Sequence, residues 1–212
     1  MTGPPISGAG PETRGTREPA RLASLPPYPL AGLPEARARL LAEGREVMDL
    51  GAGDPGLPVP AEAVEALAEG ASRPELQRYG FQRGLPRFRR AVVDFMHRRY
   101  GKELDPEAEI LPLIGSKEGL ANLAFATLDP GDVALVPDPG YAPYFGGPHM
   151  AGGRVRKVPL LAERDFIFPP QTLRRVEDDV RLVYLNYPNN PTGACVDRAY
   201  LAEVAEAVLE RK

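Results

Sequence analysis

The residues best suited to chemistry in this sequence lie in the turn Asn186 to Gly193. The turn follows an apolar run, Val180 to Leu185, that predicts a buried strand, and it precedes Asp197 to Arg211, which predicts a helix. Its two prolines and its glycine favour a fixed, non-helical connection. Because ligands of open α/β sheets bind at the carboxyl ends of strands, we interpret the side-chain amides of this turn as candidate ligand contacts. The alternative is an ordinary strand-to-helix turn.

A second candidate site lies where a predicted strand, Ile110 to Ile114, meets a predicted helix, Ser116 to Leu128. The first backbone N–H groups of a helix have no partner within it, and the helix dipole favours an anion there. The hydroxyl of Ser116 and the positive charge of Lys117 suit a phosphate monoester, although the spacing of a Walker loop is absent. From these residues alone, a phosphate cradle and a simple N-capping serine are equally compatible with the sequence.

A tyrosine follows the next predicted strand, Asp132 to Val136, in the sequence Asp138-Pro139-Gly140-Tyr141. In a parallel sheet, this order places the ring of Tyr141 at the same edge as Ser116 and Asn190. A flat side chain of this kind can stack on a planar ligand ring. Together, the three loops predict a site for a ligand that carries a phosphate and a planar ring.

The segment Gly51 to Gly56 fits the spacing G-x-G-x-x-G of dinucleotide-binding loops. That motif requires a helix to open at once, so that its N-terminus faces the pyrophosphate. Pro55, Pro58 and Pro60 exclude such a helix, so we reject a dinucleotide site. We interpret Gly53 instead as a position where a backbone N–H can approach a bound carboxylate closely.

A bent, exposed loop is predicted for Arg78 to Gly84, because it contains two glycines. Its Tyr79 is equally compatible with packing and with a ligand contact. The helix predicted next, Pro86 to Tyr100, is rich in arginine. We expect these arginines to form a solvated face rather than a phosphate site, because most lie away from the apolar stripe. They are Arg87, Arg89, Arg90, Arg98 and Arg99.

Composition narrows the class of protein. The 212 residues are 43% hydrophobic and 26% charged, which is typical of a globular chain. The net charge of -3 gives no reason to expect nucleic acid or a membrane surface as a partner, and no apolar run approaches the length of a membrane span. Cys195 is the only cysteine, so a reducing, cytoplasmic location is expected. The two histidines are isolated, and no metal site is expected.

Strands and helices alternate along most of the chain, which predicts a mostly parallel sheet with helices on both faces. The expected strands are Glu46–Leu50, Ile110–Ile114, Asp132–Val136, Arg154–Leu160 and Val180–Leu185. The expected helices are Leu33–Glu43, Ala61–Ala71, Pro86–Tyr100, Ser116–Leu128, Tyr141–Ala151, Pro170–Asp178 and Asp197–Arg211.

Three regions are predicted from these patterns. Residues 1–23 are rich in Gly, Pro, Thr and Arg and are expected to form a disordered tail without the apolar core of a signal peptide. Residues 24–60 are expected to form an N-terminal arm and a small-domain segment. Residues 61–212 are expected to form a large domain of three layers, α/β/α.

The turn at Asn186 to Gly193 resembles the Asn-Pro-Thr-Gly turn of class I and II aminotransferases, the fold-type-I enzymes that use pyridoxal 5'-phosphate (PLP). From Leu25 to the end, the chain is similar to LL-diaminopimelate aminotransferases and their near relatives, notably in Leu25–Tyr28, Asp49–Pro55 and Leu111–Gly119. The resemblance implies an aspartate-aminotransferase-like, PLP-binding large domain. It further implies transfer of an amino group between an amino acid and a 2-oxo acid, in amino-acid biosynthesis, by a homodimer.

The same resemblance implies roles for the cofactor-binding residues. Ser116 and Lys117 would hold the PLP phosphate, and Tyr141 would stack on the pyridine ring. Asn190 would donate a hydrogen bond to the phenolic oxygen of the cofactor. Tyr79 would reach the phosphate of the partner subunit's cofactor.

The resemblance also assigns substrate contacts to Tyr28, Gly53 and Lys117. Two departures from the family pattern bear on which amino acid is used. Gly56 stands where an aspartate is common, and Gln82-Arg83 stand where relatives often carry an acid. The sequence therefore leaves the substrate amino acid open.

No catalytic residue is expected within this chain. PLP transamination requires a lysine that forms the internal aldimine and moves a proton. The lysines here are Lys102, Lys117, Lys157 and Lys212, and none is suitably placed; in the family that lysine lies well beyond the Asn-Pro-Thr-Gly turn. We therefore expect the N-terminal portion of an aminotransferase. The alternatives are another fold-type-I PLP enzyme (a carbon–sulfur lyase or a decarboxylase), a regulator with an aminotransferase-like domain, and a non-catalytic fragment with at most weak PLP or phosphate binding.

Overall fold

The computed structural model describes residues 18–23, 25, 30–51, 53, 56–78 and 83–210. Contacts within the chain group into two compact units. The first, which we call the sheet unit, comprises Met1–Pro27 and Lys117–Lys212; the second, the helical unit, is Tyr28–Ser116. The domain limits expected from the sequence, 24–60 and 61–212, stay a prediction, because these units describe contacts inside this chain only.

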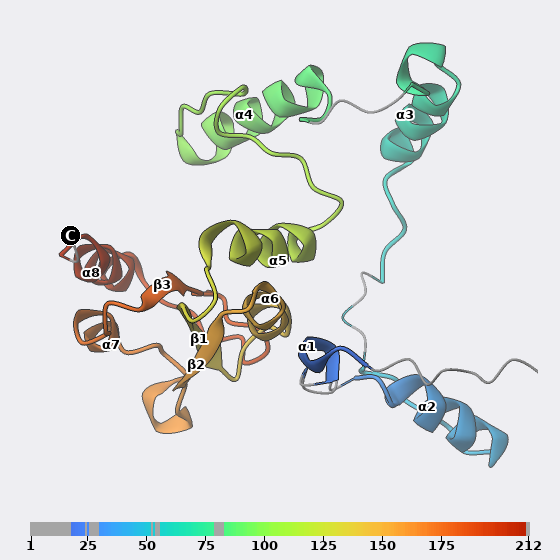
Figure 1. The fold of residues 1–212 in the computed structure, drawn as a ribbon. Helices are drawn as coiled ribbons and strands as arrows, with labels where there is room; N and C mark the ends of the chain where they lie inside the picture. The colour runs from blue at the N-terminus through green and yellow to red at the C-terminus, as the bar shows by residue number, and fades with distance from the viewer. Residues whose placement is uncertain are drawn as a thin grey trace, which may run out of the picture. The chain divides into compact units, whose positions relative to one another are not determined.

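The sheet unit is built on three parallel strands (Figure 1). Strand β1, Val133–Asp138, lies between β2, Arg154–Pro159, and β3, Val180–Val183. Val133 pairs with Arg154 on one side and with Val180 on the other, with an irregularity in register next to Val133 on the β3 side. Because all three strands run the same way, the loops that follow them all leave from the edge of the sheet formed by the carboxyl ends of the strands.

Helices cover both faces of this sheet (Figure 1). The side chains of β1 alternate between the faces, as those of a strand must. Ala134 and Val136 pack with helices α5, Ser116–Thr127, and α6, Pro143–Ala151. Val133 and Leu135 pack with helices α7, Pro170–Arg174, and α8, Arg198–Leu209. The predicted three-layer α/β/α architecture is thereby confirmed for this unit.

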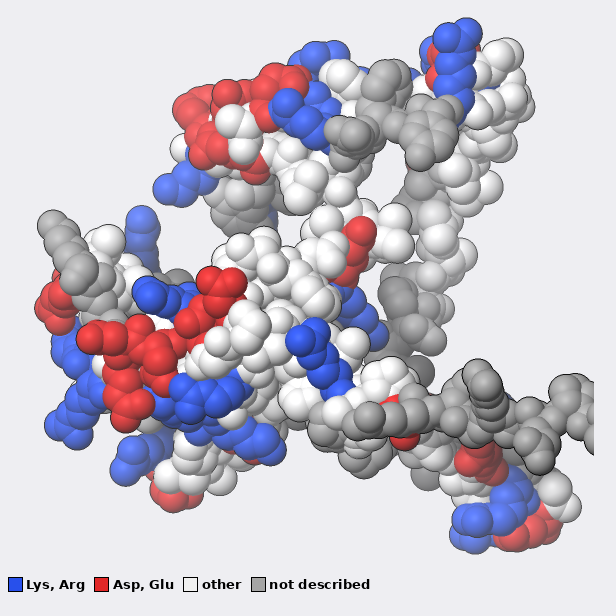
Figure 2. Space-filling model, in the orientation of Figure 1, with Lys and Arg blue, Asp and Glu red and all other residues white. Residues whose placement is uncertain are grey.

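Charged side chains of both signs border the sheet unit, and Figure 2 shows them intermixed on the visible face. Arg154 of β2 contacts Asp179 at 2.6 Å, and Arg156 contacts Glu177 at 2.9 Å. Lys157 contacts Asp138 at 3.0 Å. β2 is an edge strand of this sheet, and charges on an edge strand disfavour pairing with another chain.

The helical unit contains α2, Leu33–Ala42, α3, Ala61–Ala71, a short 3₁₀ helix η1, Pro74–Leu76, and α4, Pro86–Tyr100. The prediction is correct for α3 and α4 at both ends. Pro86 occupies the first turn of α4, where its missing N–H has no cost, and Gly101 ends the helix with φ at 63°.

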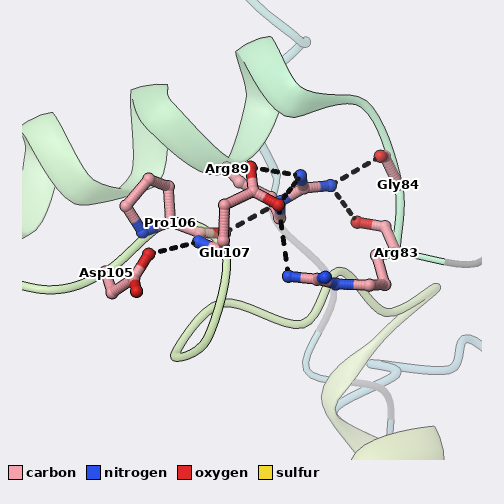
Figure 3. Close-up of polar contacts among 6 residues, drawn as sticks. All are labelled: Arg83, Gly84, Arg89, Asp105, Pro106 and Glu107. Carbon is pink, nitrogen blue, oxygen red and sulfur yellow. Dashed lines mark hydrogen bonds and ion pairs between the residues drawn. The ribbon is translucent and has the colours of Figure 1, made fainter.

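Arg89 is the exception to the solvated arginine face expected for α4, because it is only 4% exposed. Its guanidinium donates to the carbonyl oxygens of Pro106 at 2.8 Å, Arg83 at 2.6 Å and Gly84 at 2.8 Å (Figure 3). It also donates to both carboxylate oxygens of Glu107, at 2.7 and 2.9 Å. These contacts satisfy the five N–H donors of the side chain, which is how a buried arginine is stabilised. We call this group the Arg89 cluster.

Two predicted strands are wrong. Neither Glu46–Leu50 nor Ile110–Ile114 forms a strand, and most of their apolar side chains are exposed, with Leu50 at 94% and Ile114 at 97%. A strand needs a neighbour for its backbone N–H and C=O groups, and the described residues offer none to either segment.

The tail expected at residues 1–23 is described only from residue 18. There Ala20–Ala23 forms a one-turn helix, α1, rather than the disordered chain expected. Arg21 of α1 donates to the carbonyl oxygen of Met150 at 3.4 Å, so α1 is in contact with α6. A short 3₁₀ helix, η2, at Ala162–Arg164 was also not predicted.

None of the helices in the described part of the chain combines the length and hydropathy needed to cross a membrane. The described His, Cys, Asp and Glu side chains include no group of three that could hold a metal ion.

Candidate functional site

The first part of the candidate site is the start of α5. Gly115 has φ at 153°, a conformation that strongly favours glycine, and Ser116 is the first residue of the helix. The side chains of Ser116 and Lys117 are exposed. The N–H groups of the first turn, a hydroxyl and an ammonium group therefore belong to one short stretch of exposed chain that an anion can approach.

The second part is the loop that leaves β1. Gly140 is required here, because a Cβ atom at this position would lie 2.2 Å from the carbonyl oxygen of Pro137. Asp138 pairs with Lys157 of β2 and holds the start of the loop against the sheet. The chain then places the half-buried ring of Tyr141 so that the Nζ of Lys117 lies 5.9 Å from the ring centroid. The structure thus brings two predicted site residues together.

The third part is the turn after β3. Asn186 accepts a hydrogen bond through Oδ1 from the backbone N–H of Asn190 at 2.8 Å. The side-chain amide of Asn189 donates to Oγ1 of Thr192 at 2.8 Å, and its backbone N–H donates to the carbonyl oxygen of Ala194. These bonds close the turn on itself. Asn190 is exposed, so its side-chain amide is presented to solvent beyond the carboxyl end of β3.

Asn189 has one feature that the rest of the turn lacks. It is 3% exposed, and its Oδ1 is buried without a hydrogen-bond partner among the described residues. Such an atom normally finds a bond, often from a bound water molecule. Asn186 and Asn189 were predicted from the sequence only as members of this amide-rich turn, and neither was given a role of its own.

The predicted site residues that the structure describes therefore divide into three groups. Lys117 and Tyr141 lie near each other, with Ser116 adjacent to Lys117 in sequence. Asn190 follows β3 at the same edge of the parallel sheet as Tyr141, which follows β1. Gly53 belongs to the helical unit, where it is exposed and open: a Cβ atom added there would meet nothing within 4 Å.

Tyr28 and Tyr79 lie outside the described residues. Their predicted contacts with substrate and with the partner subunit's cofactor stay predictions.

The sheet-unit residues can bind a ligand of one particular chemistry. An anionic group suits the start of α5, and a flat ring suits the face of Tyr141. A hydrogen-bond donor or acceptor for a polar ring substituent is available at Asn190. A phosphate monoester attached to an aromatic ring combines these three features.

Comparison with known proteins agrees with this chemistry. The family model described as aminotransferase class I and II matches residues 45–212. An LL-diaminopimelate aminotransferase of Desulforudis audaxviator is 43% identical over 198 residues, which are 91% of this chain and 50% of that protein. One from Moorella thermoacetica is 42% identical over 195 residues, 90% of this chain and 49% of that protein. The chain thus spans about half the length of the curated relatives it matches.

Solved structures with a similar fold agree with the sequence comparison. The BacF structure from Bacillus subtilis is similar with a TM-score of 0.83 and 35% identity, over 91% of this chain and 50% of that one. The aspartate aminotransferase from Rhizobium meliloti is similar with a TM-score of 0.85 and 27% identity, over 92% of this chain and 49% of that one. The aspartate-aminotransferase-like fold expected from the sequence is confirmed.

Proposed function

Because the chain belongs to the class I and II aminotransferases, we propose that it forms the cofactor-holding part of a PLP-dependent enzyme that moves an amino group between an amino acid and a 2-oxo acid. The observation that carries the proposal is the placement of Lys117 beside the ring of Tyr141, at the open start of α5. A cation, a helix N-terminus and a flat ring at one point match the phosphate and the ring of PLP.

The residues present fit this cofactor. Ser116, Lys117 and the first N–H groups of α5 are the donors that a phosphate monoester needs. Tyr141 offers a stacking face, and Asn190 offers an amide N–H for the phenolic oxygen. When bound, PLP supplies an electron sink for reactions at the α-carbon of an amino acid. The chain's own residues bind the cofactor, orient its ring and keep its phosphate fixed.

For the substrate, we propose LL-diaminopimelate or a related amino acid. The relatives named above act on LL-diaminopimelate according to their names, and they share about two fifths of their residues with this chain. The exposed backbone of Gly53, with open space around it, is compatible with close approach of a substrate carboxylate. The identity of the relatives favours this substrate over those of a carbon–sulfur lyase or a decarboxylase.

We further propose that the complete enzyme is a homodimer, in which Tyr79 of each subunit contacts the cofactor phosphate of the other. The likeness to aminotransferases supports this assembly, since their sites commonly lie between subunits. Tyr28 is proposed to contact the substrate.

The test of the cofactor site is the dissociation constant for PLP, measured by equilibrium dialysis of the purified chain. We expect Lys117→Ala to weaken binding roughly tenfold or more, because it removes a charge-assisted contact with the phosphate. Lys102→Ala is the matched control, because Lys102 is an exposed lysine that follows α4 in the helical unit and should leave PLP affinity unchanged. Equal effects of the two substitutions would refute the phosphate site.

The substrate test uses the complete enzyme, purified from cells. We expect transfer of ¹⁵N from labelled LL-diaminopimelate to a 2-oxo acid, detected by mass spectrometry. Release of carbon dioxide, or of a sulfur-containing fragment from a thioether amino acid, without amino transfer would favour the alternative enzyme classes.

A further inference from the structure

Three tyrosines from different elements form a continuous stack beside the candidate site. Tyr141, in the loop after β1, meets Tyr144 of α6 edge-on, with ring centroids 5.6 Å apart and ring planes at 81°. Tyr144 stacks on Tyr184, which follows β3, with centroids 4.6 Å apart and planes at 18°. Tyr144 and Tyr184 are buried, at 6% and 4% exposed, whereas Tyr141 is half-buried. The stack therefore runs from the interior to the site.

The inner end of this stack is fixed to α5. The hydroxyl of Tyr184 donates to the carbonyl oxygen of Leu120 at 2.9 Å, one turn from the start of the helix. Helices α5 and α6 are also close, since a Cβ atom on Gly147 would lie 3.1 Å from Cα of Ala121. The rings thus link β3, α6 and α5 in one packed group.

The outer end returns to the same helix. Lys117, in the first turn of α5, lies beside the ring of Tyr141, and the backbone N–H of Tyr144 donates to the carbonyl oxygen of Tyr141 at 3.0 Å. The path from α5 through Tyr184, Tyr144 and Tyr141 back to α5 is therefore closed. The face of Tyr141 and the start of α5 are thus joined through packed rings whose neighbours leave little free space.

Burial raises the pKa of both Tyr144 and Tyr184 above the ordinary value, so their hydroxyls stay protonated at neutral and moderately alkaline pH. The Tyr184 hydroxyl consequently keeps its proton for the bond to Leu120 at neutral pH.

We propose that Tyr144 and Tyr184 are positioning residues that set the place of the Tyr141 ring relative to the first turn of α5. This inference rests on the proposed function, since the ring and the helix start are the two features that the cofactor would use. Neither tyrosine touches the ligand; each acts through Tyr141 or through α5. A planar ligand with a phosphate needs a fixed spacing between its two contacts, and the tyrosine stack supplies it.

The experiment observes Tyr141 directly, without a ligand. The chain is labelled with 3-fluorotyrosine, which reports each of its eight tyrosines by ¹⁹F NMR, and Tyr141→Phe assigns the resonance of Tyr141. We expect Tyr144→Leu and Tyr184→Leu to shift and broaden that resonance, and Tyr144→Phe to preserve it because the ring remains. Tyr100→Leu is the control, since Tyr100 packs on Phe95 in the helical unit. An unchanged Tyr141 resonance in Tyr144→Leu overturns the proposal.

A milder variant covers the case in which a leucine variant does not fold. Tyr184→Phe keeps the stack and removes only the bond to Leu120. We expect it to shift the Tyr141 resonance in the same direction by a smaller amount. If the resonance does not move, the link through α5 is refuted.

PLP affinity separates this inference from the proposed function. We expect Tyr144→Leu to bind PLP about three- to tenfold more weakly, with Tyr144→Phe restoring the wild-type value. Wild-type affinity for PLP in Tyr144→Leu would overturn the positioning role. A wild-type chain that binds no PLP, but whose Tyr141 resonance still responds to Tyr144→Leu, would refute the cofactor site and support the positioning of Tyr141.

Discussion

Phe168 in the sheet unit and Phe95 in the helical unit carry the same side chain, yet Phe168 is fully buried and Phe95 is 51% exposed. The contrast extends to the units as wholes. All the buried hydrophobic residues of the described chain belong to the sheet unit, whereas in the helical unit the buried residue is Arg89. The sheet unit is stabilised by an apolar core on both faces of its sheet, and the helical unit contains a buried, hydrogen-bonded arginine.

This difference shows that a helix can form in this chain without its apolar side chains being buried in a core. Helices α3 and α4 have apolar stripes, yet Val64, Leu67 and Phe88 are between 52% and 75% exposed. Terminal signals such as Pro86 and Gly101 are local and act without a partner element. Burial of an apolar stripe needs a second surface, and within the sheet unit the sheet supplies that surface to its own helices.

The largest effect is expected from Phe168→Ala. The side chain lies in the cluster between the sheet and helices α7 and α8, and its removal should destabilise the sheet unit by about 3–5 kcal/mol through lost burial and a residual cavity. Native-state hydrogen exchange of β1 and α8 measures the change without assuming that both units unfold together.

Phe95→Ala is the matched control, and it should cost less than about 1 kcal/mol because half of its ring is already exposed. Comparable losses for the two substitutions would show that the helical unit has an apolar core of its own.

A smaller effect is expected from Arg89→Met. It leaves the carbonyl oxygens of Arg83, Gly84 and Pro106 without their donor, at a cost of about 2 kcal/mol. The loss should appear as faster hydrogen exchange in α4, with β1 unaffected. Arg90→Met, an exposed neighbour on the same helix, should leave exchange unchanged. Faster exchange in the sheet unit would contradict the independence of the two stabilising groups.

The sequence predicts the sheet unit well because periodicity and burial agree there. Strands β1, β2 and β3 and the helices between them all appear within a few residues of the predicted bounds. Both wrongly predicted strands lie in the helical unit. Ile110–Ile114 and Glu46–Leu50 have the composition of strands, but composition does not reveal whether a partner strand is present. Arg89 was assigned to a solvated face because most arginines of its helix lie away from the apolar stripe. Helical periodicity gives no information about the segment Asp105–Glu107, which accepts hydrogen bonds from Arg89.

For the candidate site, the sequence correctly predicts the sheet position of two residues, and their roles stay predictions. The order of loops in a parallel sheet places Tyr141 and Asn190 at one edge, so these residues were accessible from sequence. The positioning contacts were not. Nothing in residue type distinguishes Tyr144 and Tyr184 from other aromatic core residues, because their stack joins elements distant in sequence. The buried amide of Asn189 likewise becomes evident only when the turn closes.

In the sheet unit, a single buried hydrogen bond is expected to contribute less stability than the apolar core does. Tyr200→Phe tests this expectation. The Tyr200 hydroxyl donates to the carbonyl oxygen of Phe168 at 2.8 Å, and burial raises its pKa. Losing this bond while keeping the ring should cost about 1 kcal/mol, less than Arg89→Met. Chemical denaturation followed by tyrosine fluorescence measures the change, with Tyr100→Phe as the exposed control. A loss above that of Arg89→Met would remove the distinction between the units.

The smallest effect concerns acid, and it should be confined to the helical unit. Hydrogen bonds from Arg89, and then from Arg83, hold the pKa of Glu107 below its ordinary value. A carboxyl whose pKa is lower in the folded chain contributes stability that is complete above the unfolded pKa, about 4.3, and is lost as the pH falls through the folded pKa. Glu107 is exposed to solvent, which screens its charge, so the change should be modest.

Protection of α4 from hydrogen exchange, corrected for intrinsic rates, should therefore decrease below about pH 4.5, and Glu107→Gln should abolish that decrease. Glu62→Gln, which changes an exposed carboxylate of α3, should preserve it. An acid-dependent loss of protection that persists in Glu107→Gln would show that the Arg89 cluster does not govern the stability of α4.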